Sequence, residues 1–206
     1  MAFRSLTIRV KDNNDEAPRF VGGCPVSLSV YENLPGPFPT TIGTTIAEDL
    51  DSGENGLVVY SITEGNTSLF SMNSETGELL LLHSLDREFR SEYLLTVQAR
   101  DSGSPRQLSV CTIRIAVLDD NDNPPVFTQP YYVIHVRENA PLGQKVLDVF
   151  AADADQGENG HVKYSLLEGE SFAIDKESGE LSVSAELDRE HIAVHRLMVE
   201  AKDSGR

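Results

Sequence analysis

An internal repeat constrains this chain more than any other feature of its sequence. Six short motifs occur twice in the same order, with an offset of 102 to 107 residues, in a chain of 206 residues. The pairs are DNNDEAP (12–18) with DDNDNPP (119–125), YEN (31–33) with REN (137–139), DLDSGENG (49–56) with DADQGENG (153–160), TGEL (76–79) with SGEL (178–181), LDRE at 85–88 and 187–190, and DSG at 101–103 and 203–205. A fixed period of this length predicts two units of roughly 100 residues, each with its own core.

Apolar and polar residues alternate between the motifs, which is typical of half-buried strands. The alternation is clearest at residues 26–30, 93–99 and 111–117, and it also precedes residue 137. Turn signals such as Pro35-Gly36 and Ser104-Pro105 interrupt the alternation at short intervals, and no long helical period is present. The pattern favours an all-β sandwich.

The charge balance excludes several classes of partner. The chain has 33 acidic and 17 basic residues, a formal net charge of -16. This sign argues against binding to nucleic acid or to anionic membrane surfaces. The acids recur inside patterned sequence rather than in runs, so bound hard cations are the leading explanation for them. No apolar run long enough to span a membrane and no signal-peptide core is present, so we expect any anchor or export signal to lie outside these residues.

Together the motifs resemble the cadherin superfamily. The resemblance rests on the DxNDN-type linkers, the xEN motif, DxD followed by NG, LDRE, and DSG after a strand, and it covers essentially the whole chain. It implies an all-β fold of tandem Greek-key β-sandwich repeats. Because the chain has no Trp, it lacks the residue that the best-known adhesive cadherins exchange, and it is similar to internal repeats of protocadherin, Fat or Dachsous-like proteins.

The resemblance also implies a function. We expect calcium-dependent adhesion or cell–cell recognition, homophilic or heterophilic, in which calcium ions at the junctions rigidify the extracellular region of a membrane-anchored protein. The partners would be other cadherin molecules, and neither an enzymatic activity nor a small-molecule substrate is expected. A calcium-independent sandwich of immunoglobulin or fibronectin type is the rival, and its acids would be surface groups only.

The alignment of the two copies of the motifs predicts the domain boundaries. Three apolar residues before the first linker align with three before the second: Leu6, Ile8 and Val10 with Ile113, Ile115 and Val117. We therefore interpret residues 1–18 as the last strand and linker of a preceding repeat, 19–125 as a complete repeat with its linker, and 126–206 as a second repeat that stops before its last strand. The strand at 1–11 either stays unpaired or pairs with another molecule.

The resemblance assigns calcium ligands residue by residue. At the complete junction they are Glu32, Asp86, Glu88, Asp119, the Asp120 carbonyl, Asn121, Asp122, the Asn123 carbonyl, Asp153, Asp155, the Asn159 carbonyl and Asp203. At the 12–18 junction they are Asp12, Asn14, Asp15, Asp49, Asp51, Asn55 and Asp101, enough for one ion. Glu16 departs from the family there, where Asn is usual. Glu138, Asp188 and Glu190 would await a further linker.

Other interpretations of these acids are weaker. An ordinary solvated turn would explain one DxD, but it would leave seven carboxylates crowded at one junction without compensation. An EF-hand over 49–56 would place Gly53 at its fifth position and lacks flanking helices. Paired acids could also hydrolyse glycosides, but the pairs recur in both repeats and the chain has no Trp for a sugar platform.

Two further sites remain open from sequence. Asn66-Thr67-Ser68 is an acceptor for N-glycosylation within a turn signal, or else a turn Asn that happens to precede Thr and Ser. Cys24 and Cys111 each lie eight residues before a junction landmark, and both are in phase with apolar neighbours, so we expect both to point inward. Because the first and last strands of cadherin repeats run side by side, the resemblance allows a disulfide between them, with two reduced buried cysteines as the alternative.

Overall fold

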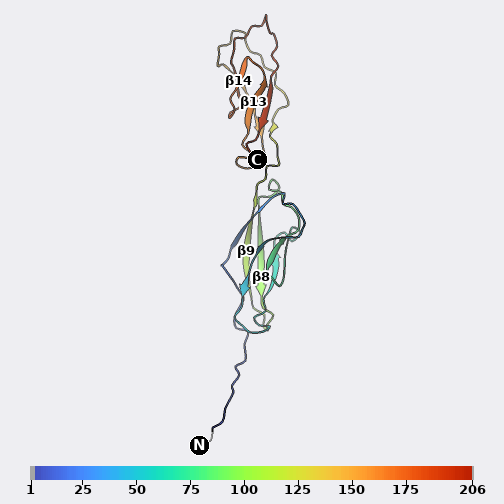
Figure 1. Cartoon of the computed structure of the whole chain (residues 1–206), viewed down its shortest axis with the longest axis vertical. Coiled ribbons are helices and arrows are strands. Elements are labelled where there is room, and N and C mark those ends of the chain that lie inside the picture. The colour runs from blue at the N-terminus through green and yellow to red at the C-terminus, as the bar shows by residue number, and fades with distance from the viewer. Residues whose placement is uncertain (1–2, 206) are drawn as a thin grey trace. The chain divides into compact units, whose positions relative to one another are not determined.

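The structure is a computed structural model that describes residues 3–205, all of whose regular secondary structure is β-strand. The chain divides into two compact units, unit 1 over residues 1–118 and unit 2 over residues 119–206 (Figure 1). Within the described range, no helix could cross a membrane.

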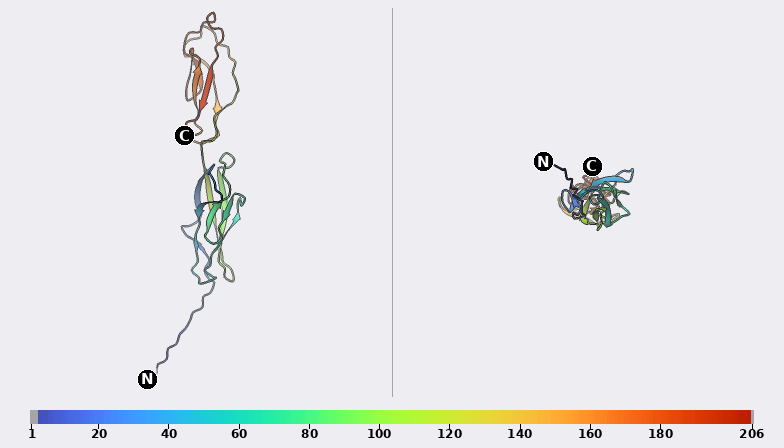
Figure 2. Two further views of the ribbon diagram at one scale, coloured as in Figure 1. Left: turned by 45° about the vertical axis from the view of Figure 1, so that its right-hand side comes forward. Right: turned by 90° about the horizontal axis from the view of Figure 1, so that it is seen from below.

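Among its described residues, unit 1 contains nine strands, which pair in three sheets. Figure 2 gives further views of these strands. The strands are β1 (Arg19–Phe20), β2 (Val26–Tyr31), β3 (Thr40–Thr44), β4 (Ala47–Glu48), β5 (Val59–Glu64), β6 (Phe70–Met72), β7 (Glu78–Leu81), β8 (Glu92–Arg100) and β9 (Leu108–Leu118). One sheet has the order β2-β9-β8-β5, the second β3-β7-β6, and β1 pairs with β4. In the first sheet β9 lies between β2, to which it is parallel, and β8, to which it is antiparallel.

The core of unit 1 lies between its two larger sheets. Leu95 and Val97 of β8 and Ile113 of β9 are buried against Phe70 of β6 and Leu79 of β7. These residues are the inward members of the alternation seen in the sequence, and each buried aliphatic side chain contributes about 1.5 to 3 kcal/mol to stability. The predicted tandem β-sandwich fold is confirmed.

The repeated TGEL and SGEL motifs form the same turn in both units. Gly77 and Gly179 have positive φ angles of 70° and 72°, a conformation that favours glycine. Their carbonyls accept hydrogen bonds from Thr45 N and Val149 N at 2.9 and 3.0 Å, which tie the turn to the residue that directly follows a neighbouring strand. A side chain at Gly77 would collide with the Thr45 carbonyl. The glycine of this motif is therefore structural.

The described part of unit 2, residues 119–205, has seven strands. They are β10 (Val126–Phe127), β11 (Lys145–Asp148), β12 (Ala151–Ala152), β13 (Lys163–Glu168), β14 (Phe172–Ile174), β15 (Glu180–Val183) and β16 (Met198–Lys202). Its sheets have the orders β11-β15-β14, β13-β16 and β10-β12, which reproduce the β3-β7-β6, β5-β8 and β1-β4 pairings of unit 1. Among the described residues of unit 2, no strand corresponds to β2 or β9.

The alternating segment before residue 137 is therefore not a strand, contrary to the pattern in the sequence. In unit 1 the matching strand, β2, forms its ladder with β9. Unit 2 has no counterpart of β9 in its described residues, so the backbone at 131–137 lacks a partner with which to form a ladder. Alternation alone does not make a strand without a neighbour to accept its hydrogen bonds.

Cys24 and Cys111 form a disulfide in the structure, with their Cα atoms 5.6 Å apart. Cys111 lies in β9 and is buried, as its phase predicted. Cys24 is exposed, so the expectation that it points inward is wrong. It precedes β2, whose alternation begins only at Val26, and its sulfur accepts a hydrogen bond from Thr112 N at 3.2 Å.

We predict that protein made in an oxidising compartment contains the Cys24–Cys111 bond. Mass spectrometry after alkylation without reductant should recover one peptide pair linked through these residues, because the Cα separation suits a disulfide. Recovery of both thiols as alkylated species would reject the bond.

We also predict that unit 2 is the less stable unit of the 206-residue chain, since its described residues contain no counterpart of β9, the buried strand that joins β2 to β8 in unit 1. In dilute protein, amides of β16 should exchange with deuterium at least 10-fold faster than those of β8, as measured by mass spectrometry of peptic peptides. Equal protection of the two strands would contradict this expectation.

Candidate calcium sites

The first polar cluster lies at the end of unit 1 where β4 and β8 end. Asp49 and Asp51 follow β4 directly, and Asp101 follows β8. The Asp51 amide donates to Asp49 Oδ1 at 2.9 Å, which turns the chain and leaves the second oxygen of Asp49 available. Asp101 is only 1% exposed, so its charge is held inside the protein. Strand ends thus bring three acids into one loop region.

The segment before β1 packs onto the same region. Asp12 Oδ2 accepts hydrogen bonds from Ser52 N at 3.1 Å and from Asn55 Nδ2 at 2.8 Å. The amide of Glu16 donates to Asp51 Oδ2 at 3.1 Å. Acidic residues of the linker and of the DLDSGENG loop are therefore neighbours although about 40 residues separate them in sequence.

Asn14 occupies the centre of this cluster in a fixed orientation. Its Nδ2 donates to Asp101 Oδ2 at 2.9 Å and to the Pro105 carbonyl at 2.5 Å. If the Asn14 amide were flipped, its Oδ1 would face the Asp101 and Pro105 oxygens, which also only accept hydrogen bonds. Asn14 Oδ1 therefore points away from these two acceptors.

Two buried oxygen atoms in the cluster have no donor. No described residue donates a hydrogen bond to Asn14 Oδ1 or to Asp49 Oδ2. A buried acceptor without a donor is costly, and an ionised carboxylate even more so. A water molecule could supply donors but would not offset the charges of Asp49, Asp51 and Asp101. Amide and carboxylate oxygens converging from separate loops fit Ca²⁺, which takes six to eight oxygen ligands in irregular geometry.

Unit 2 builds the same cluster from its own residues. Asp119 accepts hydrogen bonds from Gln156 N at 3.0 Å and from Asn159 Nδ2 at 2.8 Å. Asn121 Nδ2 donates to Asp203 Oδ1 at 3.1 Å. Each of these contacts repeats one made by Asp12 or Asn14 in unit 1.

Two further contacts of the second cluster also match the first. Asn123 N donates to Asp155 Oδ2 at 3.2 Å, and Asp155 N donates to Asp153 Oδ1 at 2.9 Å. The buried acceptors that no described residue satisfies are Asn121 Oδ1 and Asp153 Oδ2, the counterparts of Asn14 Oδ1 and Asp49 Oδ2. Chance would not leave the same two atoms without donors in both units.

The glycine of each DSG motif was given no role by the sequence, and the structure supplies one. A Cβ at Gly103 would lie 2.6 Å from both Asn14 Nδ2 and Asn55 Oδ1. A Cβ at Gly205 would lie 2.5 Å from Asn159 Oδ1 and 2.7 Å from Asn121 Nδ2. Glycine therefore leaves free the space that these amides occupy beside the DSG turn. Its recurrence after Asp101 and Asp203 was the signal that could have identified it.

A second group of acids lies at the opposite end of β9 in unit 1. Glu32 is buried, and its Oε2 accepts a hydrogen bond from Arg87 N at 2.6 Å. Carboxylate oxygens of Glu32 and Glu88 lie within 4.8 Å of each other. Burial raises the pKa of the Glu88 carboxyl above its usual value, and the charge of Glu32 raises it further. Asp86 is exposed, and its Oδ1 accepts from Phe89 N at 2.7 Å.

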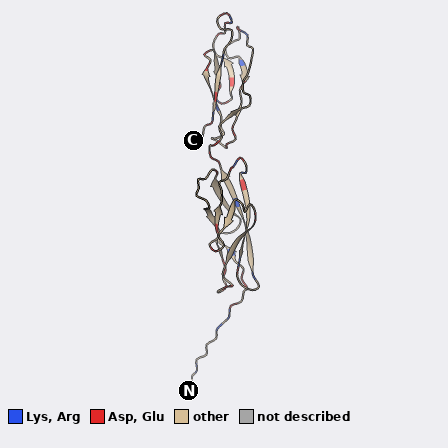
Figure 3. Ribbon diagram, turned by 90° about the vertical axis from the view of Figure 1, so that its right-hand side faces the viewer, with Lys and Arg blue, Asp and Glu red and all other residues tan. Residues whose placement is uncertain are grey.

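Unit 2 repeats this group with Glu138, Asp188 and Glu190. Oxygens of the three carboxylates lie within 4.8 Å of one another, and all three residues are exposed. The charge of Glu138 raises the pKa of the Glu190 carboxyl. Negative charge is thus concentrated at corresponding positions of both units, and acidic residues occur in each of them (Figure 3).

Not every expected ligand lies within a cluster. The Asp15 side chain is exposed and forms no hydrogen bond with the other cluster residues in the described range. Asp120 is also exposed, which suits its expected role through the backbone carbonyl. Asp122 has a carboxylate oxygen within 4.8 Å of Asp155, and its Oδ1 accepts from Asn123 Nδ2 at 2.6 Å. The expected ligation by Glu32, Asp86 and Glu88 together with the linker stays a prediction.

Asn66 lies in the turn between β5 and β6. Its Oδ1 accepts hydrogen bonds from Ser68 N and Ser68 Oγ at 3.1 and 2.6 Å, and Thr67 and Ser68 are exposed. This Asx-type turn presents the acceptor sequence on the surface. Glycosylation of Asn66 stays a prediction.

Comparison with known proteins places this chain in a family. The cadherin domain model matches residues 26–118 and 132–206. The chain is 44% identical over 206 residues to Protein dachsous of Drosophila melanogaster and 42% identical over 203 residues to Cadherin-3 of Caenorhabditis elegans. These matches cover 98% and 96% of this chain but only 6% of each relative, so the chain spans a small part of their length.

Solved structures of cadherin repeats also match this chain. The protocadherin gammaB7 EC3-6 cis-dimer structure matches with a TM-score of 0.88 at 32% identity, over 97% of this chain and 50% of that one. Mouse Cadherin-23 EC22-24 matches with a TM-score of 0.81 at 34% identity, over 92% of this chain and 61% of that one. The resemblance inferred from the motifs is confirmed, and the chain belongs to the cadherin domain family.

Proposed function

We propose that this chain is a calcium-rigidified segment of the extracellular region of a membrane-anchored adhesion protein. The observation that carries the proposal is the pair of buried, donorless oxygens that recurs in both units, Asn14 Oδ1 with Asp49 Oδ2 and Asn121 Oδ1 with Asp153 Oδ2. The role is structural rather than catalytic: the ions hold tandem repeats in a defined arrangement, and the repeats present a recognition surface.

One ion would be held in each cluster by side chains from three segments of the chain. In unit 2 these are the linker, through Asn121, the loop after β12, through Asp153 and Asp155, and the end of β16, through Asp203. The positive charge of a calcium ion would offset the negative charge of the carboxylates. The ion would also be coordinated by the oxygen atoms that accept no hydrogen bond. Unit 1 would hold its ion through the matching residues Asn14, Asp49, Asp51 and Asp101.

A pair of further ions would join the units. Glu32 N donates to the Leu118 carbonyl at 2.9 Å, so the end of β9 lies beside the buried Glu32, and Asp119 is the next residue along the chain. We propose that Glu32, Asp86 and Glu88 share these ions with the linker acids. Without ions the carboxylates of both sides repel one another, and the linker becomes a flexible hinge.

Other cadherin molecules are the proposed partners. Relatives with known structures are titled as extracellular cadherin domains, and one of them is titled as a cis-dimer. We propose an extracellular location for the present chain and recognition of another cadherin, homophilic or heterophilic. A calcium-independent sandwich is the rival, and it would tolerate the removal of calcium without loss of stability.

We predict that calcium raises the melting temperature of the 206-residue chain, with binding in the range of about 0.1 to 1 mM. At about 100 times the dissociation constant, an ion that binds only the folded state contributes about 2.7 kcal/mol. Calorimetric melting with calcium, with magnesium and with chelator measures the effect. The Asp153→Asn variant keeps the size of the side chain and the hydrogen bond to Asp155 N but removes a charge, so it should reduce the calcium effect. Identical melting with calcium and with chelator would refute the proposal.

We further predict that Asp122→Ala loosens the junction more than Asp51→Ala does, because Asp122 serves the ions that join the units and Asp51 serves unit 1 alone. Small-angle X-ray scattering in calcium should show a broader distribution of dimensions for Asp122→Ala. The exposed Glu75→Gln variant, outside both clusters, is the control. Equal effects of the two Asp variants would contradict the assignment.

A further inference from the structure

The chain contains two Asn-Gly pairs, and they occupy the same position in both units. Asn55-Gly56 ends the DLDSGENG loop and Asn159-Gly160 ends the DADQGENG loop, and no other Asn of the sequence precedes a glycine. An Asn-Gly pair is chemically labile, because glycine has no side chain to hinder attack of its backbone nitrogen on the side-chain amide of the Asn. Each unit therefore carries one amide that can be lost in water.

The fold requires the glycine of each pair. A Cβ at Gly56 would lie 2.1 Å from the Asp51 carbonyl oxygen. In the same way, a Cβ at Gly160 would lie 2.1 Å from the Asp155 carbonyl oxygen. A backbone oxygen cannot move aside as the end of a flexible side chain can, so no larger residue fits at either position without a shift of the loop.

The fold also requires the Asn of each pair. Asn55 Nδ2 donates a hydrogen bond to Asp12 Oδ2 at 2.8 Å. Asn159 Nδ2 donates the corresponding hydrogen bond to Asp119 Oδ2, also at 2.8 Å. An Asp at either position would have no hydrogen to donate and would set a second negative charge against the linker carboxylate. Both members of the labile pair are thus fixed by structure.

The carbonyl end of each Asn amide is enclosed as well. Asn55 Oδ1 lies where a Cβ at Gly103 would be only 2.6 Å away, and Asn159 Oδ1 lies where a Cβ at Gly205 would be 2.5 Å away. Both Asn residues are half-buried. The side-chain amide is therefore held on one side by a linker carboxylate and on the other by the DSG turn.

We propose that Asn55 and Asn159 are deamidation sites, and that the linker residues Asp12 and Asp119 protect them. In the reaction, the backbone nitrogen of the following glycine loses its proton and attacks Cγ of the Asn. A five-membered succinimide ring forms and ammonia leaves. Water then opens the ring at either carbonyl and produces Asp or isoAsp. The reaction consumes one water molecule, releases one ammonia molecule and needs no oxidant or reductant.

The contact with the linker slows this reaction in two ways. Ring closure brings Cγ of Asn55 within bonding distance of the Gly56 nitrogen, so the side chain has to move and the hydrogen bond to Asp12 has to break first. The negative charge of Asp12 also disfavours the nitrogen anion that attacks Cγ, because like charges repel. When the linker leaves the loop, both obstacles disappear.

Deamidation would also prevent the linker from returning. The product carries a carboxylate at the position from which Asn55 Nδ2 donates to Asp12. Two carboxylates cannot share a hydrogen bond when both are ionised, and they repel each other. The same holds for Asn159 and Asp119 in unit 2. Each Asn-Gly pair therefore records, independently of the other, that its linker has left its loop.

The test follows deamidation of the 206-residue chain during incubation at mildly alkaline pH, measured by mass spectrometry of peptides that contain one pair each. Asp12→Ala should accelerate deamidation of Asn55 by about 10-fold or more, the factor expected for the loss of a hydrogen bond to a charged group, and should leave Asn159 unchanged. Asp119→Ala should do the reverse. Each variant is thus the control for the other, since the unaffected pair reports that the rest of the protein is folded.

A conservative variant separates the hydrogen bond from a general loosening of the loop. Asp12→Asn keeps an oxygen that can accept from Asn55 Nδ2, so Asn55 should deamidate more slowly in Asp12→Asn than in Asp12→Ala. An unchanged rate at Asn55 in Asp12→Ala, equal acceleration of both pairs, or equal rates in Asp12→Asn and Asp12→Ala would each overturn the proposal. All rates are compared at one calcium concentration, and the protecting hydrogen bonds join protein atoms only. The reciprocal pattern is therefore expected even if the clusters bind no calcium.

Discussion

Carboxylate and amide oxygens that lack donors are the constraint on which the organisation of this chain depends. An ionised Asp can only accept hydrogen bonds, and backbone amides of the loops satisfy one oxygen of Asp49 and Asp153 while the other stays buried without a donor. The strands bring these acids together at their ends, so the stability gained by packing the sandwich forces the charges into proximity. A bound cation relieves that cost, and folding and ion binding become coupled.

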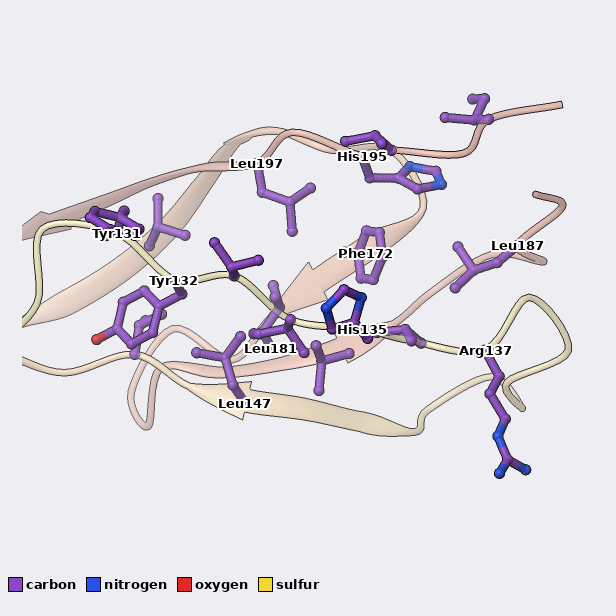
Figure 4. Close-up of a pocket in the computed structure, with 18 of the residues that line it drawn as sticks. Tyr131, Tyr132, His135, Arg137, Leu147, Phe172, Leu181, Leu187, His195 and Leu197 are labelled. Carbon is purple, nitrogen blue, oxygen red and sulfur yellow. The ribbon is translucent and has the colours of Figure 1, made fainter. Parts of the chain in front are cut away.

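The second constraint is the strand β9. It pairs on both edges, it buries Ile113 and Ile115 in the core, and its end holds the Leu118 carbonyl against Glu32 N. One strand thus completes the sheet and positions the linker that follows it. In unit 2 the core positions that a counterpart of β9 would cover remain partly exposed around a groove lined by Leu147, Phe172 and Leu181 (Figure 4), although β13, β15 and β16 keep their pairings. The rest of the sandwich therefore forms its sheets without this strand, but it does not close its core.

Much of the fold and of the clusters could be predicted from the sequence because the repeat fixes a register. That register aligned Asp12 with Asp119 and Asp101 with Asp203, and the structure gives each pair the same kind of hydrogen-bond partners. The exposure of Cys24 could not be predicted from phase, because the alternation of β2 begins only at Val26. The segment before residue 137 has a strand pattern but lacks a partner strand, and pattern carries no information about partners. The recurrence of the DSG glycine after Asp101 and Asp203 marks Gly103 as a candidate, but its role depends on the close approach of Asn14 and Asn55, which the sequence does not show.

The central claim is that the two repeated clusters bind calcium. Equilibrium dialysis with radioactive calcium tests it most directly, because it counts ions without reference to stability or shape. The account predicts saturable binding in the range of about 0.1 to 1 mM, reduced by Asp153→Asn and reduced further when Asp49→Asn is added. Binding that is absent, or that neither substitution changes, would contradict the account.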